Sequence, residues 1–401
     1  MIPLDDTIGA TWSPEHRLLQ ISARDFIRNG DAKKSTATVP RAVGGEINED
    51  VLLQVGEQEG MLPIVREYVL KNGAAPDLSG SLKDRLHAAS LNQHMNSLST
   101  VGNLLEVLDL FEHAHIEAVP FKGPVLSQAL FGDVGYRRSV DLDLLLPREA
   151  IRHAKEVLVA RGFIPQYDMK PQEEREYIDS GLAYGFYHTG KACLIELHWT
   201  LMPLHNASTI PPELVWDHTG EEVLFGRTML QIDHRLLLVY LCLHASKHQW
   251  SKMKWIIDIA SLLHRCTDED LREIVVLAGQ LGCRRVLNMG ILLSEALFSV
   301  TVTPSVQAAA HKDRVAKRLV AEVLSYWLFM PDDDKGFAEL AWYHVRERER
   351  VRDKLPLLLH DVGLALKPSE KDKAFVRLPD GMAFLYPLVR PARLVSDLIR
   401  R

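Results

Sequence analysis

The sequence is poor in cysteine, and this limits the kinds of cross-link and metal site that it can form. Its 401 residues include four cysteines, Cys193, Cys242, Cys266 and Cys283, and no two of them have the C-x-x-C spacing of a zinc or redox motif. Three of the four lie in apolar stretches that are typical of buried helix or strand. We therefore expect unpaired, reduced thiols in a cytoplasmic protein rather than a disulfide framework or a zinc site.

Long hydrophobic runs and an excess of basic charge are also missing. No stretch approaches the roughly 20 apolar residues that a membrane-spanning helix requires, and the acidic segment 1–10 lacks the apolar core of a secretory signal. The net charge is −6 at pH 7, whereas a protein that binds nucleic acid usually carries a basic surface. The sequence predicts a soluble protein without a membrane partner, and it disfavours nucleic acid as a partner.

What is present is an ordinary globular composition, 47% hydrophobic and 25% charged, in a chain long enough for two or three domains. Apolar residues recur at helical spacing in the first hundred residues and again from residue 233 onward, after a final extended stretch at 223–231. Between these regions strand and helix patterns alternate, and Thr189-Gly190 indicates a hairpin. We predict an α+β fold in which a small mixed-sheet domain, residues 101–226, is flanked by an N-terminal helical region, 1–100, and a C-terminal helical domain, 227–401.

Two polar segments interrupt the helical patterns. Residues 29–46 are polar and contain glycine, which indicates a mobile loop. Residues 346–350 read Arg-Glu-Arg-Glu-Arg within a helical pattern. Alternating charges at this spacing predict a solvated helix face with ion pairs between residues four apart.

The triplet Asp141-Leu142-Asp143 is the most informative short pattern. In a strand, residues i and i+2 point to the same face, so the two carboxylates project together. They repel each other, and burying them unpaired would be costly. A divalent cation such as Mg²⁺, which prefers oxygen ligands, removes both problems. The apolar run 144–146 predicts that this strand is buried, although a solvent-facing edge strand can carry the same triplet.

A second strand pattern, 194–201, carries Glu196 among apolar residues. An acidic side chain in such a place is costly unless it is paired. We predict that Glu196 is a third oxygen ligand of the cation or the base that takes a proton from an acceptor hydroxyl. The alternative is an ion pair with Arg137 or Arg138. His198 shares the face of Glu196 and is either a hydrogen-bond partner of a metal ligand or a core histidine.

Two short segments near the acidic triplet can bind phosphate. Lys122-Gly123 ends a strand pattern and opens a helix, where backbone amides attract anions and glycine allows close approach. Arg138-Ser139 comes directly before the acidic strand, where an arginine can hold a triphosphate with two hydrogen bonds. Ser139 could instead simply end the loop.

A helix pattern downstream carries His244, Lys247 and His248, which share one face by their i, i+3, i+4 spacing. Lys247 could contact phosphate there, with Asp258 of the next helix orienting it. The alternative is that this face is a polar rim of a helical bundle. Two histidines on one face can also bind zinc, but the lysine between them argues against a zinc site.

Several motifs occur together in this chain. They are Phe-Lys-Gly at 121–123, Leu-Phe-Gly-Asp at 130–133, Arg-Ser-Val-Asp-Leu-Asp-Leu-Leu at 138–145, Glu-Leu-His-Trp-Thr-Leu at 196–201, the helices at 244–248 and 254–260, and a C-terminal segment at 378–391. In this combination they resemble the uncharacterised nucleotidyltransferase family, part of the DNA polymerase β-like nucleotidyltransferase superfamily. The resemblance runs from about residue 50 to the end of the chain.

The resemblance implies an enzyme that uses Mg²⁺ or Mn²⁺ to move a nucleoside monophosphate group from an NTP, with ATP expected, to an acceptor. The acceptor would be a hydroxyl or phosphate of a small molecule, a peptide or a protein. Asp141, Asp143 and Glu196 would be the catalytic and metal-binding residues. The nucleotide-binding residues would be Lys122, Gly123, Arg138, Ser139, Lys247 and His248.

One position departs from the wider superfamily. Its phosphate-binding turn usually reads Gly-Ser or Gly-Gly, whereas this chain has Gly123-Pro124, and proline offers neither a hydroxyl nor an amide proton. A catalytically inactive nucleotide-binding or partner-binding module on the same fold is therefore the alternative function. A nucleic-acid end-modifying enzyme is disfavoured by the acidic charge balance.

Overall fold

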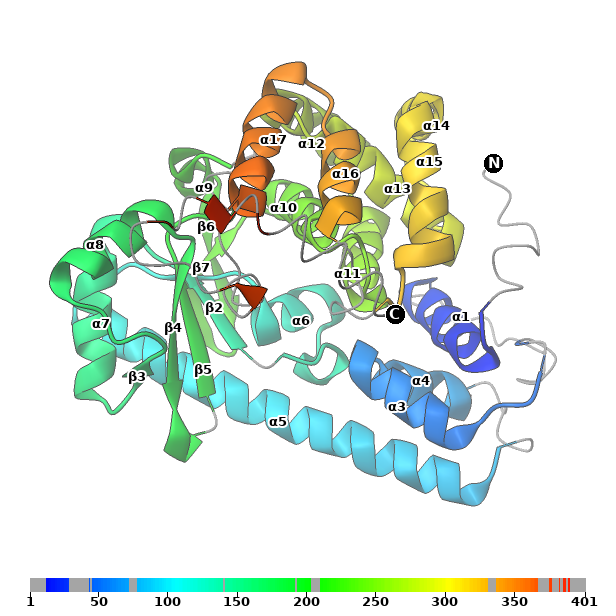
Figure 1. Cartoon of the computed structure of the whole chain (residues 1–401). Helices are drawn as coiled ribbons and strands as arrows, with labels where there is room; N and C mark the ends of the chain where they lie inside the picture. The colour runs from blue at the N-terminus through cyan, green and yellow to red at the C-terminus, as the bar shows by residue number, and fades with distance from the viewer. Residues whose placement is uncertain are drawn as a thin grey trace.

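The computed structural model describes residues 12–28, 43, 45–71, 78–139, 141–191, 193–202, 210–330 and 337–366, with a few single positions nearer the C-terminus. The polar segment 29–46 and the motif at 378–391 fall almost wholly outside these residues. Within them, a five-stranded mixed sheet is flanked by helices (Figure 1), which confirms the predicted α+β class.

The sheet has the strand order β1-β2-β5-β4-β3. Its strands are β1 (Val119–Pro120), β2 (Asp141–Leu145), β3 (Ile164–Pro165), β4 (Ala183–His188) and β5 (Cys193–His198). The central pair β2–β5 is parallel, and the other neighbours are antiparallel. The parallel pairing places the beginnings of β2 and β5 at the same edge of the sheet. The predicted hairpin at Thr189-Gly190 is present as the short 3₁₀ turn between β4 and β5.

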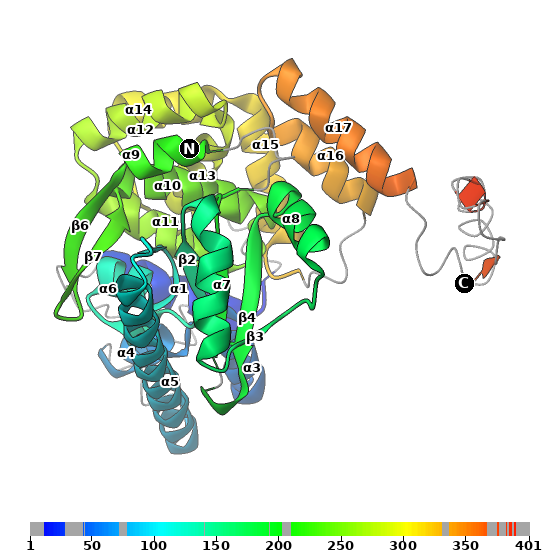
Figure 2. The same ribbon diagram turned by 90° about the vertical axis from the view of Figure 1, so that its left-hand side faces the viewer.

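The alternation of side chains along β2 gives the sheet two different faces. Leu142 and Leu144 belong to a core formed with α7 (Ile151–Ala160) and the C-terminal half of α5 (Gly80–His113). Figure 2 shows α7 in front of the strands. Asp141 and Asp143 point to the opposite face. That face is turned toward α6 (Gly123–Phe131) and α10 (His234–Lys247).

A second and larger core joins the two ends of the described chain. The N-terminal helices in it are α1 (Pro14–Arg28), α3 (Glu49–Glu59) and α4 (Leu62–Lys71). The C-terminal ones are α10, α11 (Met253–Arg265), α12 (Asp268–Leu281), α13 (Arg284–Phe298), α14 (Pro304–Lys312) and α15 (Arg314–Glu322). The predicted boundary near residue 100 falls inside α5, and that near 226 falls at the turn between β6 (Thr219–Leu224) and β7 (Arg227–Ile232). The division into three segments remains a prediction.

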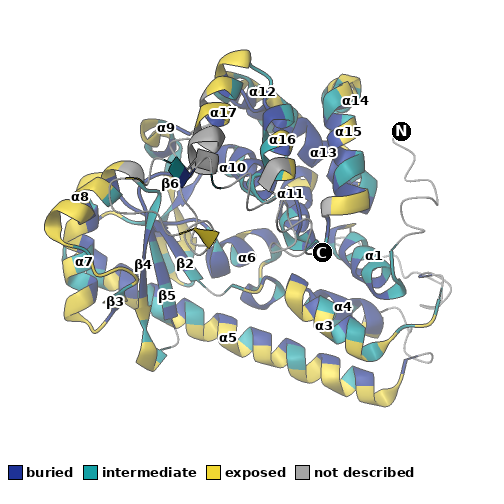
Figure 3. Ribbon diagram, viewed as in Figure 1, coloured by how far each residue is buried: buried dark blue, intermediate teal, exposed yellow. Residues whose placement is uncertain are grey.

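Helix α5 has 34 residues, is about 50 Å long and runs along one side of the molecule (Figure 1). Ser79 caps its first turn by accepting a hydrogen bond from the Leu82 amide. Its outward face is largely exposed (Figure 3). On its inner face, the buried Gln93 donates to the carbonyls of Gly60 and Gly135 at 3.3 and 2.8 Å. This side chain therefore ties α5 to the α3–α4 turn and to the loop that precedes β2.

Three smaller elements complete the described part of this region. The segment after Phe163 contains two strand residues before α8 (Pro171–Ser180). Strands β6 and β7 form a hairpin whose two turn residues, Phe225 and Gly226, both have positive φ. A short helix, α9 (Pro212–Asp217), precedes this hairpin and was not predicted.

The charged run 346–350 is not a solvated helix face. Helix α16 (Phe337–Glu347) ends inside the run, and α17 (Val351–Leu366) begins after it. Glu347 and Arg348 are 1% and 3% exposed and form an ion pair at 3.0 Å. The hydroxyl of Ser246, on α10, donates to Glu347. The charge pattern is the same for a continuous helix and for a helix junction, so the break could not be inferred from it.

The expectations about membrane-spanning helices and about cysteines can be compared with the structure. None of the described helices is long and apolar enough to cross a bilayer. The four cysteines are free thiols, three of them buried. Their burial agrees with the apolar stretches in which they lie.

One buried ion pair connects the sheet region to the C-terminal helices. Arg137, in the loop before β2, places its Nε 2.9 Å from a carboxylate oxygen of Asp258 on α11. Their side chains are 8% and 2% exposed. Asp258 was expected to orient Lys247, and that expectation was wrong. Because both charges are desolvated, each one stabilises the fold only while the other is present.

We predict that Arg137→Met lowers the free energy of unfolding by about 3–5 kcal/mol, since it leaves the Asp258 carboxylate buried without its partner. The neighbouring Arg138 is the matched control, because its side chain is 43% exposed and pairs with the exposed Glu57. Arg138→Met should change stability by no more than about 0.5 kcal/mol. Urea unfolding followed by circular dichroism measures both, and equal losses would show that the buried pair has no special role.

Candidate active site

The parallel register of β2 and β5 brings the predicted carboxylates together. Asp143 lies opposite Glu196, and Leu145 lies opposite His198. Since side chains alternate along each strand, Asp141, Asp143, Glu196 and His198 all share one face of the sheet. The apolar residues between them point into the other core. Two motifs that are about fifty residues apart in the sequence thus form one cluster.

Asp143 is the best-connected member of this cluster. Its side chain is 3% exposed, and its Oδ1 accepts hydrogen bonds from Lys122 Nζ at 3.1 Å and His198 Nε2 at 3.0 Å. An ionised carboxylate can only accept, so Nε2 carries the proton. Burial by itself raises the pKa of Asp143, but the Lys122 charge and the His198 hydrogen bond outweigh it and lower this pKa below its usual range.

The other two carboxylates have different surroundings. Burial and the negative charge of Asp143 raise the pKa of Asp141, against the opposing influence of Lys122. Glu196 is 36% exposed, and its Oε2 lies 3.4 Å from His198 Nε2. Neither arginine forms the alternative ion pair with Glu196. Arg137 pairs with Asp258, and Arg138 pairs with Glu57. The cluster therefore holds one well-compensated carboxylate and one that is disfavoured as an anion.

Three of these side chains are placed to share a cation. Asp143, Glu196 and His198 each offer a ligand atom, and the three atoms lie within 4.8 Å of one another. The sequence predicted Asp141 in this set and left His198 as either a partner or a core histidine. His198 is buried and contacts both carboxylates, while its Nδ1 has no hydrogen-bond partner among the described residues. Carboxylate oxygens with one imidazole suit a divalent cation.

The Lys122-Gly123 turn lies against the beginning of β2. Lys122 Nζ points at Asp143 and lies 5.6 Å from the centre of the Tyr240 ring, on α10. Gly123 has φ +62°, and a Cβ there would come within 3.2 Å of Ser139 Oγ and 3.3 Å of the Asp141 carbonyl oxygen. The left-handed backbone and this close approach together require glycine. The predicted phosphate turn is thus adjacent to the acidic cluster, with its lysine already bound to a carboxylate.

The three residues His244, Lys247 and His248 on one face of α10 have different neighbours. Burial and the nearby charge of Lys122 lower the pKa of Lys247, whereas Glu196 raises it. The Lys247 ammonium is thus close enough to Lys122 and Glu196 for their charges to influence its pKa. The rings of His244 and His248 pack on Trp255 of α11, with centroids 5.4 and 5.0 Å away. His244 is also influenced by the cluster: burial and the charge of Lys122 lower its pKa well below the usual value, whereas Asp143 raises it.

Arg138 and Ser139 line a polar cavity of about 500 Å³ next to α5. The α5 side of this cavity carries Asn92, Gln93, Asn96, Ser97, Ser99, Thr100 and Asn103. Ser139 Oγ is buried without a hydrogen-bond partner in the described part of the chain. Sequence reasoning missed this cavity. The spacing of asparagines at 92, 96 and 103, which repeats with the helical period, was the available signal.

A family model described as "Uncharacterised nucleotidyltransferase" matches residues 45–299. The match runs from the residues before α3 to the end of α13 and contains every residue of the cluster and its surroundings. It ends well before the C-terminus, whereas the resemblance was expected to continue through the tail. No curated protein sequence and no solved structure matches the chain.

The two aspartates of the triplet should respond in opposite ways to neutralisation. Asp143→Asn should lower the free energy of unfolding by about 3 kcal/mol, because it leaves the Lys122 ammonium buried without its counter-charge. Asp141→Asn should leave stability unchanged or raise it near pH 7, because the raised pKa of Asp141 means that its ionised form is disfavoured in the folded protein.

Chemical unfolding at pH 7 without added divalent cation measures both effects. Lys122→Met combined with Asp143→Asn is the control, and the double variant should lose less than the sum of the two single losses. If Asp141→Asn is as damaging as Asp143→Asn, the assigned pairing of Asp143 is incorrect.

Proposed function

Because the chain belongs to the uncharacterised nucleotidyltransferase family, we propose that it moves a nucleoside monophosphate group from an NTP to a hydroxyl or phosphate of an acceptor. The acceptor is a small molecule, a peptide or a protein, and ATP is the expected donor. The observation that carries this proposal is the pairing of Asp143 with Glu196 across two parallel strands, beside Lys122. Nucleotidyl transfer needs clustered carboxylates and cationic groups at one place.

Mg²⁺ or Mn²⁺ bound at this cluster would neutralise phosphate oxygens and lower the pKa of the acceptor hydroxyl. Asp141, Asp143 and Glu196 are proposed to hold it, with His198 either as a further ligand or as the residue that orients Asp143. The donor set fits a hard cation, since three of the four side chains offer carboxylate oxygens. Keeping Asp143 ionised through Lys122 and His198 prepares the site for such an ion.

The charges around the cluster are proposed to bind the triphosphate. Lys122 is held between Asp143 and the Tyr240 ring, so its ammonium is fixed in position. Lys247 adds a second positive charge on the α10 side. Pro124 removes one amide donor from the first turn of α6. The ammonium groups of Lys122 and Lys247 are proposed to attract the phosphates in place of that missing amide. His248 is proposed to support Lys247 through its packing on Trp255.

The polar cavity beside Arg138 and Ser139 is the proposed place for the nucleoside part of the NTP. Its volume of about 500 Å³ lies in the usual range for small-molecule sites. Asn92, Asn96 and Asn103 offer uncharged amide donors and acceptors, which suit a base and a ribose better than a second phosphate. Ser139 is next to both Gly123 and Asp141, so a ligand in this cavity can reach the cluster.

Incubation with each labelled NTP, Mg²⁺ or Mn²⁺, and a panel of hydroxyl- and phosphate-bearing acceptors tests the proposal. We expect metal-dependent label transfer and pyrophosphate release that Asp141→Asn abolishes. Asp141→Asn is the suitable blank because it should not destabilise the fold. Nucleotide binding without any turnover would instead support the alternative function, an inactive nucleotide- or partner-binding module, for which Pro124 is the specific argument.

Glu196→Gln separates catalysis from binding. Glutamine preserves the shape of a half-exposed side chain but removes its charge, so NTP affinity should stay within a few-fold of the original. The transfer rate should fall by about 10²-fold or more, which is typical when a catalytic electrostatic or proton-transfer group is lost. Equilibrium NTP binding and single-turnover pyrophosphate release measure the two quantities. Unchanged turnover would remove Glu196 from the mechanism.

A further inference from the structure

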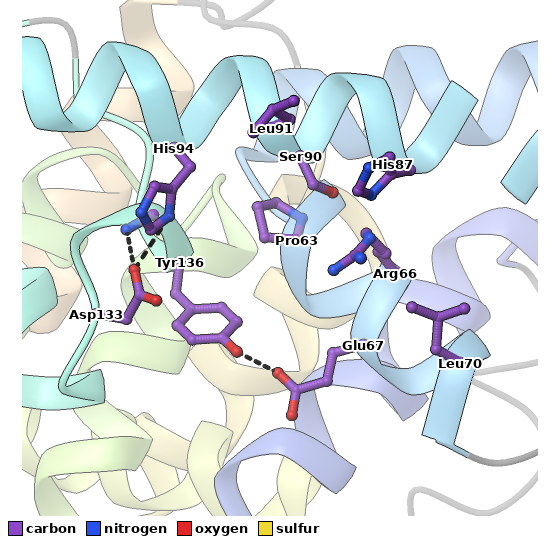
Figure 4. A pocket seen from close by; sticks show the side chains of 11 residues that line it. Pro63, Arg66, Glu67, Leu70, His87, Ser90, Leu91, His94, Asp133 and Tyr136 are labelled. Carbon is purple, nitrogen blue, oxygen red and sulfur yellow. Dashed lines mark hydrogen bonds and ion pairs between the residues drawn. The ribbon is translucent and has the colours of Figure 1, made fainter. Parts of the chain in front are cut away.

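A second cavity of about 500 Å³ lies between α4, α5 and the 3₁₀ turn Val134–Tyr136 (Figure 4). Its lining residues differ from those of the acidic cluster and of the polar cavity. Side chains from all three elements converge on it, among them Arg66 and Glu67 of α4, His87 and His94 of α5, and Tyr136. None of these side chains has a role in the proposed nucleotidyl transfer.

The two carboxylates at this cavity already have partners. Glu67 accepts a hydrogen bond from the Tyr136 hydroxyl. Asp133 Oδ1 accepts from the Gly135 amide at 2.7 Å and lies 3.3 Å from His94 Nδ1. Figure 4 shows both contacts at the wall of the cavity. The acidic groups are thus held in place by the protein itself.

Arg66 is in a different position. It is half-buried, and its Nε is buried without a hydrogen-bond partner among the described residues. A guanidinium is always charged at physiological pH, and a buried charged donor without an acceptor is unfavourable. Because the half-buried Arg66 lines the cavity, an anionic group there can pair with its guanidinium, and carboxylates and phosphates match the geometry of arginine best. His87, on the α5 side, is exposed and can add a second donor.

The apolar part of the lining consists of Pro63, Leu70 and Leu91. Leu70 and Leu91 are each 54% exposed, and Pro63 also lines the cavity. Small-molecule sites typically combine such an apolar wall with a few convergent polar groups. We propose that this cavity binds a small molecule whose carboxylate or phosphate group pairs with Arg66 and whose apolar body packs on Leu70 and Leu91.

Two aromatic anions serve as probes. Benzoate and phenyl phosphate share an apolar ring and differ in the anionic group, and benzylamine and benzyl alcohol are the cationic and neutral controls. Isothermal titration or ligand-detected NMR with the full chain should show saturable binding of at least one anion. The tighter of the two identifies the anionic group. Arg66→Met should weaken it by about ten-fold or more, as expected when a charge-assisted hydrogen bond is lost.

Two further variants keep the test decisive. Leu70→Asp, at an exposed position that should not affect folding, should also weaken the anion by placing a like charge in the apolar wall. Arg318→Met removes an exposed arginine on α15, outside the cavity, and should leave binding unchanged. The proposal is overturned if neither anion binds saturably, if benzylamine or benzyl alcohol binds as tightly, or if Arg318→Met weakens binding as much as Arg66→Met.

Discussion

A carboxylate buried next to two others is stable only when positive charge lies close to it, and the structure around Asp143 meets this constraint. Lys122 comes from the turn before α6 and His198 from β5, and both contact the same carboxylate oxygen. Tyr240 of α10 packs against Lys122, with its ring centre 5.6 Å from Lys122 Nζ. The electrostatic requirement of one side chain thus connects the sheet with the Lys122-Gly123 turn and, through Lys122, with α10.

The same constraint produces an asymmetry between the two aspartates of the triplet. Asp143 has its counter-charges within the protein and remains ionised, whereas Asp141 is disfavoured as an anion by burial and by Asp143. A cation added to such a cluster is attracted to a ligand that is already deprotonated, and it relieves the repulsion at the other. The arrangement therefore favours cation binding without requiring it for folding, because Lys122 stabilises Asp143 in either case.

Buried polar contacts between distant segments were the features hardest to foresee. The chain pattern around Asp258 and around residues 346–350 is compatible with solvent-exposed charges. Arg137 and Asp258 nevertheless form a buried ion pair, and the buried Glu347 accepts a hydrogen bond from Ser246 of α10. Nothing local distinguishes a charged residue that faces water from one that meets a partner more than a hundred positions away. The two cavities beside α5 were hard to foresee for the same reason. Each is lined by residues of α5, of the helices α3 or α4, and of the loop before β2, which are far apart in the sequence.

The sequence by itself determined the local features of this protein. Side-chain alternation at 141–146 and 194–201 indicated two buried strands with acidic residues on one face, and the combined motifs indicated the family. Tertiary structure decided which residues meet. The parallel register sets Asp143 opposite Glu196 and brings His198 to both, and packing directs Arg137 to Asp258. The reason is physical: periodicity depends on the backbone geometry of a few neighbouring residues, whereas a contact depends on how whole elements pack against one another.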